Sequence, residues 1–297
     1  MKKHYAVISV VLAGVLWGLI GIFIKKLSSF GLDSIQIAFI RMIIASISFG
    51  LYVLFKDKSL FRISTKDIWM FIGTGIISVS LFNICYFYTI IHSEASLAVV
   101  LLYTSPVFVV LFSALLFKEK ITANKIIALV LAFAGCVLTA GLLGGVSVKP
   151  FIILTGIASG LFYALYSIFG KFALKKYSTY TVTVYTFIFG LIGDLFIAKP
   201  VETAGIIIGN PQVLFWCFGI GIISTVLPYF FYTKGLENLE SGKAAILVAV
   251  EPLVGAVIGM AFLNESCSLT KITGIILIIV SIILLNIRFN EVKNDEN

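Results

Sequence analysis

The chain has 297 residues, of which 60% are hydrophobic and 12% are charged, and its net charge is +8. A soluble domain of this size cannot cover so much apolar surface, which excludes a soluble enzyme or binding module. The basic excess does not indicate a nucleic-acid partner, because the lysines and arginines gather in alternate connections between apolar segments, a pattern typical of membrane topology.

Ten apolar stretches are long enough to cross a bilayer, since a spanning helix needs about 20 apolar residues. They are apolar on all faces, whereas the strands of a membrane barrel alternate apolar and polar residues. The sequence therefore predicts an all-α integral membrane protein with ten transmembrane helices near residues 5–25, 33–55, 68–91, 95–117, 122–143, 151–174, 179–198, 212–235, 243–263 and 270–288.

Span one contains the first candidate pathway residue, Trp17, within the spacing Gly14-x-x-x-Gly18. Two glycines four residues apart share a helical face and let a neighbouring backbone approach closely. Span two carries Arg41, and an ionisable residue inside the membrane normally faces a cavity or a partner. Arg41 could face an anionic substrate group, snorkel toward the helix end, or form a structural ion pair, and the sequence leaves these alternatives open.

Spans three and four add polar and aromatic candidates. A buried tyrosine or asparagine needs a partner for its polar atoms, which a wet cavity can supply. Pro106 lies about midway along span four, where it removes a backbone hydrogen bond and opens the helix. The result is either a hinge or polar notch on the transport pathway, or a static kink. The candidates in these two spans are Asn83, Tyr86, Tyr103, Ser105 and Pro106.

The second half of the chain repeats the first at a constant offset of 146 positions. The glycine-rich segment 73–81 recurs at 219–227, and several charged residues recur as well: Lys25 as Lys171, Glu94 as Glu240, Glu119 as Glu265 and Lys125 as Lys271. Each copy holds five spans, an odd number, so the second copy enters the membrane from the opposite side. We expect two inverted five-helix repeats at 1–143 and 150–289, with a polar tail at 290–297.

In the second repeat, Glu251 is the most notable ionisable residue. A carboxylate at the centre of a span costs about 2.5–3.5 kcal/mol on insertion scales, so it normally faces a cavity or a partner. It could bind a substrate amine, carry a proton, or pair with Arg41. Asp194, near the end of span seven, is expected to be interfacial. The remaining candidates are the repeat equivalents of Trp17, Tyr86 and Pro106, namely Tyr163, Tyr232 and Pro252.

The distribution of basic residues predicts the orientation. With the N-terminus inside, sixteen of the 22 lysines and arginines fall on the inner side, five fall on the outer side, and Arg41 lies within the membrane. The positive-inside rule then places both termini in the cytoplasm. No cofactor or metal site is expected, because the four cysteines form no C-x-x-C pair and the only histidines are His4 and His92.

This combination of features resembles the EamA family of the drug/metabolite transporter superfamily. The resemblance covers residues 5–288 in two copies. It rests on Trp17-Gly18 with Lys25, Arg41 with Ala45, Ser105-Pro106 ending in Glu119, and Glu251-Pro252 ending in Glu265. It implies a central cavity lined by spans one, three, four, six, eight and nine. Spans five and ten would lie outside, where a homodimer contact would form. Family members commonly export amino acids and other small metabolites, and relatives move nucleotide sugars or drugs.

The leading hypothesis is a secondary transporter that exports small metabolites, most of all amino acids, across a bacterial inner membrane by alternating access. No sequence resembles a P-loop, so ATP is not the direct energy source. A transporter of drugs or nucleotide sugars is the alternative within the same class, and a channel or non-transporting sensor is the alternative outside it. An intramembrane enzyme would need clustered His, Asp or Glu side chains, which the spans do not offer.

Overall fold

In the computed structural model the described residues are 2–93, 95–140, 149–195, 197–262 and 268–286, and every regular element within them is helical. The first half contains α1 (Lys2–Gly18), α2 (Ile20–Ser28), α3 (Ser34–Lys56), the short turns η1 (Lys58–Phe61) and η2 (Thr65–Asp67), α4 (Ile68–Ile72), π-helical η3 (Gly73–Ser80), α5 (Leu81–His92), α6 (Ala95–Leu102), α7 (Ser105–Phe117) and α8 (Ala123–Thr139). The second half contains α9 (Pro150–Leu174), α10 (Thr179–Leu195), α11 (Pro200–Gly209), α12 (Val213–Gly221), π-helical η5 (Ile222–Val226), α13 (Leu227–Leu236), α14 (Ser241–Leu247), α15 (Val250–Phe262) and α16 (Leu269–Asn286).

The helices confirm the predicted all-α membrane fold. Seven continuous segments of the described chain are long and apolar enough to cross a membrane, and they correspond to predicted spans one to four, six, eight and nine. The helix of span seven, α10, reaches that length only together with α11, and α8 and α16 are shorter apolar helices. Each of the ten predicted spans therefore contains helix. Between the two predicted repeats, residues 144–148 lie outside the described residues, as does the tail at 290–297.

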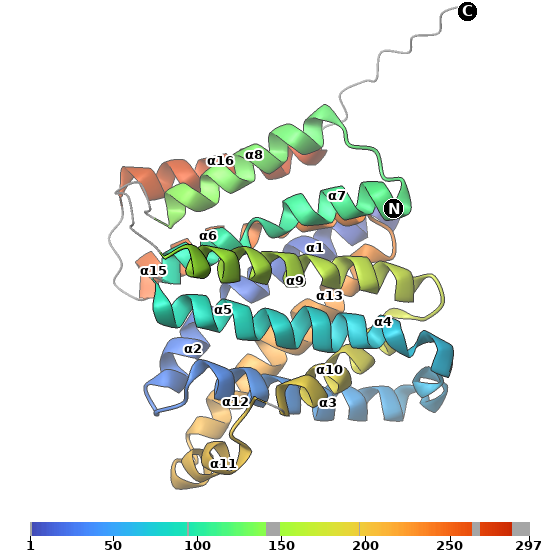
Figure 1. The fold of residues 1–297 in the computed structure, drawn as a ribbon, viewed down its shortest axis with the longest axis vertical. Coiled ribbons are helices and arrows are strands. Elements are labelled where there is room, and N and C mark those ends of the chain that lie inside the picture. Colours follow the sequence, from blue (N-terminus) through green and yellow to red (C-terminus); the bar gives the residue numbers. More distant parts are fainter. Residues whose placement is uncertain (1, 94, 141–148, 196, 263–267, 287–297) are drawn as a thin grey trace, which may run out of the picture.

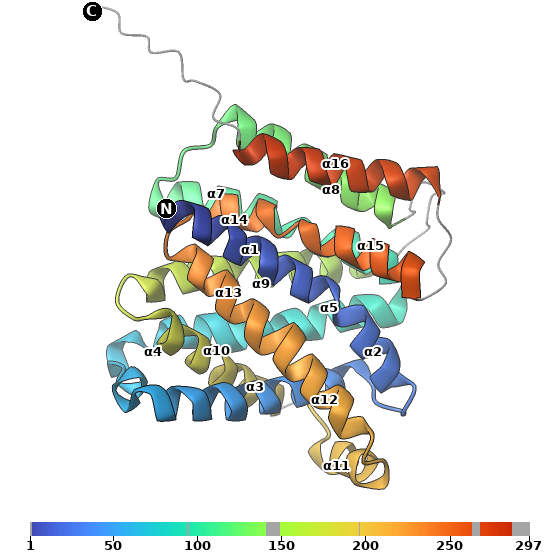
Figure 2. The same ribbon diagram turned by 180° about the vertical axis from the view of Figure 1, so that it is seen from behind.

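One helix was not predicted. α11 follows span seven and lies at the edge of the molecule beyond α10, beside α12 (Figures 1 and 2). It begins at Pro200, where the missing N–H of proline is no loss in a first helical turn. Ile206 and Ile207 pack against the start of α12, whereas Val201 is 86% exposed. With only 10 residues, the segment is too short to have been recognised from span length.

The two halves interlock in a way that follows the sequence repeat. α1 packs along α13 and α15 of the second half, while its equivalent α9 packs along η3, α5, α6 and α7 of the first half. α3 packs against α10, and α8 packs against α16 at one side of the molecule (Figures 1 and 2). Spans five and ten, which are formed by α8 and α16, therefore lie outside the central group of helices, as the family resemblance implied.

The repeated glycine-rich segment provides matched close contacts between the halves. A Cβ atom on Gly73 would lie 2.3 Å from the Cγ atom of Phe169, and one on its equivalent Gly219 would lie 2.5 Å from the Cε1 atom of Phe23. Phe23 and Phe169 are themselves repeat equivalents. Each half thus packs an equivalent phenylalanine ring against the equivalent glycine of the other half, and these two contacts hold the repeats together.

The same glycine-rich segments adopt π-helical geometry in both halves, at η3 and η5. A π-helical turn leaves backbone carbonyls without their usual i+4 donors, and hydroxyl side chains compensate here. Ser78 donates to the carbonyl of Gly73 at 2.7 Å, and Thr225 donates to the carbonyl of Ile220 at 2.9 Å.

Candidate functional site

Spans four and nine are interrupted at equivalent places. α6 ends at Leu102 before α7 begins at Ser105, and α14 ends at Leu247 before α15 begins at Val250. Pro106 and Pro252 lie in the first turns of the helices that follow, and neither can donate a backbone hydrogen bond. The predicted opening of both helices is therefore present. It places Tyr103 and Glu251 on the two breaks.

Glycines of the neighbouring helices pack directly against the two breaks. A Cβ atom on Gly14 of α1 would lie 2.4 Å from Val250 Cγ1 and 3.2 Å from the carbonyl oxygen of Val248. Its repeat equivalent, Gly160 of α9, would place a Cβ atom 3.1 Å from the carbonyl oxygens of Leu101 and Leu102. Only a residue without a side chain admits these carbonyls so closely, so each break is buried against the first helix of the other half.

An aromatic cluster lies beside the breaks. The ring of Trp17 is 5.3 Å from that of Tyr229, 5.6 Å from that of Tyr232 and 6.2 Å from that of Tyr163, measured between centroids. Tyr166 is 5.2 Å from Tyr229 and extends the cluster along α9. The structure thus brings together Trp17, Tyr163 and Tyr232 from the predicted set. It adds Tyr166 and Tyr229, which were not among the site residues predicted from the sequence.

Several tyrosine hydroxyls in this region have hydroxyl partners. Tyr166 and Thr233 share a hydrogen bond of 2.5 Å, and Tyr232 and Ser167 share one of 2.7 Å. The Tyr103 hydroxyl is buried, and it has no hydrogen-bond partner of good geometry among the described residues although it faces the Glu251 carboxylate. A buried donor without a partner is costly, so a bound polar group at this place would be stabilised.

Glu251 is the carboxylate of this cluster. Its side chain is partly exposed at the start of α15, and Tyr86, Tyr103 and Tyr163 lie within electrostatic reach of it. Tyr86 stacks on Phe82, whose ring lies 5.5 Å from that of Tyr163. The predicted residues Tyr86 and Tyr103 are therefore near Glu251, while Ser105 and Pro106 are buried on the neighbouring break.

Arg41 supplies the opposite charge. It is 8% exposed within α3, and its Nε donates to Thr225 Oγ1 at 3.0 Å. The π-helical turn η5 presents that threonine to the arginine. Arg41 does not snorkel to the helix end, because the hydrogen bond holds it in the interior. Among the described side chains it also has no carboxylate within 4.0 Å, so of the alternatives left open by the sequence a direct ion pair with Glu251 is not formed here, although both carboxylates, Glu251 and Asp194, remain within electrostatic reach.

Asp194 corrects a second expectation. It was expected to be interfacial, but its side chain is fully buried in α10. The Asn83 amide donates to one carboxylate oxygen at 3.4 Å, while the other oxygen has no partner among the described residues. Asn83 therefore contacts Asp194 rather than the aromatic cluster. Nothing in the sequence distinguishes this pair from the other polar residues of spans three and seven.

No group of three or more His, Cys, Asp or Glu side chains that could hold a metal ion occurs in the described parts of the chain. Cys85, Cys136 and Cys217 are free thiols, and Cys267 lies outside the described residues, as do Glu94 and Glu265. The site thus combines a buried guanidinium, a partly exposed carboxylate and a set of aromatic rings. This arrangement can bind a small solute that carries both a cation and an anion.

Comparison with known proteins supports the helical membrane fold. The model of the EamA-like transporter family matches residues 4–141 and 150–287. An uncharacterized transporter of Archaeoglobus fulgidus is 31% identical over 252 residues, covering 83% of this chain and 86% of its own. The uncharacterized inner membrane transporter YicL of Salmonella typhimurium is 28% identical and covers 94% of both chains. A solved crystal structure with 16% identity superposes with a TM-score of 0.78 over 95% of this chain and 96% of its own, which supports the fold.

Proposed function

Because the chain belongs to the EamA-like transporter family and is an integral membrane transporter, we propose that it exports small zwitterionic metabolites, most of all amino acids, across a bacterial inner membrane. The family model matches residues 4–141 and 150–287, which supports two repeats at 1–143 and 150–289, and an inverted arrangement of these repeats would suit alternating access. In that mechanism the halves exchange conformations and open one central site first to one side and then to the other.

The substrate proposal rests on the placement of Arg41 and Glu251. These two opposite charges lie beside the aromatic cluster and do not form a direct ion pair. A guanidinium binds a carboxylate well, and a carboxylate together with aromatic faces binds an ammonium group. Because the two protein charges do not satisfy each other, each is available to one end of a zwitterion. An α-amino acid carries these two charges with opposite sign to the protein groups, and its side chain would lie against Trp17 and the tyrosines.

The proposed orientation rests on the distribution of basic residues, and the proposed energy source rests on Glu251. The excess of basic residues on one side supports a topology with both termini in the cytoplasm. The start of α1 and the end of α16 lie at the same end of the bundle, since Lys3 and Leu285 line one pocket there. Transport would draw on an ion gradient, and Glu251 is the group proposed to carry a coupling proton. We propose no enzymatic activity.

The experiment is uptake of a labelled amino-acid mixture into proteoliposomes, with and without an imposed pH gradient. Saturable uptake of particular amino acids, with counterflow, supports a carrier and rules against a channel or a sensor. Arg41→Met should reduce uptake of amino acids more than Arg62→Met, which removes the same charge from a loop outside the spans. Uptake of nucleotide sugars or amphipathic drugs by folded protein, with no amino-acid uptake, would replace this substrate class by the alternative one.

A further inference from the structure

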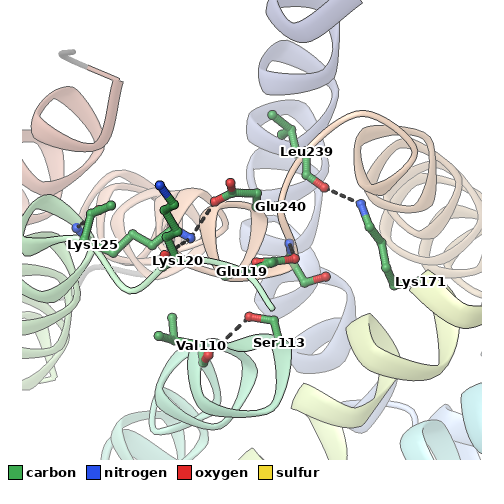
Figure 3. A network of polar contacts seen from close by, with 11 residues as sticks. Val110, Ser113, Glu119, Lys120, Lys125, Lys171, Leu239 and Glu240 are labelled. Carbon is green, nitrogen blue, oxygen red and sulfur yellow. Dashed lines mark hydrogen bonds and ion pairs between the residues drawn. The ribbon is translucent and has the colours of Figure 1, made fainter. Parts of the chain in front are cut away.

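Three charged side chains, one just after α7, one in α8 and one in α9, hold the short segment that links α13 to α14. Glu119 follows α7, Lys125 lies in the first turn of α8, and Lys171 lies near the end of α9 (Figure 3). All three contact the segment Leu236–Gly242. We call this set of contacts the clasp. It joins the two halves of the chain, because Glu119 and Lys125 belong to the first repeat and the segment belongs to the second.

Glu119 contributes two hydrogen bonds to the clasp. Its Oε1 accepts from the backbone N–H of Ser241 at 2.7 Å, and its Oε2 accepts from that of Gly242 at 3.2 Å. A Cβ atom on Gly242 would lie 3.1 Å from Val110 Cγ2, so the start of α14 lies close against α7. The carboxylate therefore fixes the first turn of span nine to the end of span four.

The two lysines hold the rest of the segment. The Nζ atom of Lys125 lies 2.5 Å from Glu240 Oε2 and donates to the carbonyl of Lys120 at 2.7 Å. The Nζ atom of Lys171 donates to the carbonyls of Leu236 at 2.7 Å and Leu239 at 2.5 Å. Lys125 is 6% exposed and Lys171 is half-buried. These contacts compensate both ammonium groups for their partial loss of hydration.

The clasp lies between the exterior and the aromatic cluster. It forms part of the wall of a pocket of 770 Å³ at the lysine-rich end of the bundle, where Lys3, Lys118, Lys175 and Lys243 also contribute. Beyond it along α9 and α13 come the hydrogen-bonded pairs Ser167–Tyr232 and Tyr166–Thr233. Tyr166 and Tyr232 are buried, whereas Tyr163 and Glu251, farther from the clasp, are partly exposed. The clasp and the buried Tyr166 and Tyr232 thus lie between this pocket and the partly exposed Tyr163 and Glu251.

The sequence preserves the clasp as a unit. The four charged side chains that make these contacts each have an equivalent of the same type 146 positions away: Lys25, Glu94, Glu265 and Lys271 for Lys171, Glu240, Glu119 and Lys125. The charged residues Arg41, Asp194 and Glu251 have no such match. The described members of the equivalent set belong to α2 and the first turn of α16, which lie at the opposite end of the bundle (Figure 2). Four matches suggest that these residues act together rather than as four separate surface charges.

From these contacts we propose that the clasp is the gate at the lysine-rich end, and that its ion pair and hydrogen bonds must break before substrate can enter the site from that end. This inference rests on the proposed alternating access. The clasp residues do not contact the substrate; they set the balance between the state closed at this end and the state open at it. Removing one contact shifts that balance toward the open state, by about tenfold for a hydrogen bond to a charged group.

The test measures access without requiring a substrate. The parent protein has its four cysteines replaced and carries Ser167→Cys, a buried reporter behind the clasp. In oriented proteoliposomes, a membrane-impermeant maleimide is added from the lysine-rich side. We expect Glu119→Gln and Lys171→Met to label about tenfold faster than the parent. Lys175→Met is the matched control. Lys175 lines the same pocket, but its ammonium group lies over the rings of Phe117 and Phe172 and not against the clasp segment.

A charge exchange distinguishes a gate from general loosening. Lys125→Glu alone should accelerate labelling, and adding Glu240→Lys should slow it again toward the parent rate. Melting temperatures identify any variant that does not fold, and Glu119→Gln keeps the shape of the side chain, so it is the variant on which the test depends. Parent-like labelling of folded Glu119→Gln, or equal acceleration by Lys175→Met, would overturn the gate. Loss of amino-acid uptake in the unmodified protein would overturn only the proposed function.

Discussion

The contact between α1 and α15 gives the sharpest stability prediction. A Cβ atom added at Gly18 would lie 2.6 Å from Val254 Cβ and 2.8 Å from the backbone oxygen of Glu251. Neither neighbour is the end of a flexible side chain, so the backbone of α15 must move. Overpacking of this kind costs about 1–3 kcal/mol. Gly18→Ala should therefore destabilise the protein and displace Glu251 from the aromatic cluster.

Gly21 supplies the matched control. It lies three residues further along, in α2, and a Cβ atom there would meet nothing within 4 Å. Gly21→Ala adds the same methyl group and gains helix propensity, which stabilises by about 0.5–1 kcal/mol. Thermal unfolding in detergent measures both variants. One kcal/mol corresponds to roughly 2–4 °C for a chain of 150–250 residues, so Gly18→Ala should melt several degrees below Gly21→Ala. Equal melting temperatures would refute the close approach of α1 and α15.

Three further predictions concern the polar groups of the interior. Glu251→Gln should abolish uptake driven by a pH gradient while leaving counterflow measurable, and a normal gradient response would show that another group carries the proton. Thr225→Val removes the acceptor that positions Arg41, so the half-saturating concentration for amino acids should rise on the order of tenfold. This rise should be smaller than the rise for Arg41→Met. An unchanged value would contradict the positioning role of Thr225. Asn83→Leu leaves the Asp194 carboxylate without its donor and should lower the stability measured by melting by about 1–3 kcal/mol. The double variant Asn83→Leu with Asp194→Leu should lose less stability than the sum of the two single changes. Strict additivity would exclude the hydrogen-bonded pair.

Much of the architecture could be predicted from the sequence, because its signals are local or strictly periodic. Span length follows from hydropathy, and the inverted repeat follows from the offset of 146 and the odd number of spans. The breaks in spans four and nine follow from Pro106 and Pro252, since a missing N–H acts on its own helix wherever that helix lies. α11 was missed because a short helix outside a span leaves no such signal.

The candidate site depended on information that a linear pattern does not contain. Which residue faces which partner is set by the rotation of each helix and by its packing against distant segments. Arg41 and Thr225 are 184 positions apart, and Asn83 and Asp194 are 111 apart. A single turn of either helix would change the partner, which is why the sequence left the partner of Arg41 open and did not indicate the burial of Asp194. The sequence by itself determined the two inverted halves and the charges of the clasp. Only the tertiary structure decided that these charges meet across the segment Leu236–Gly242, because the close approach of α7, α8 and α9 brings them within hydrogen-bonding distance.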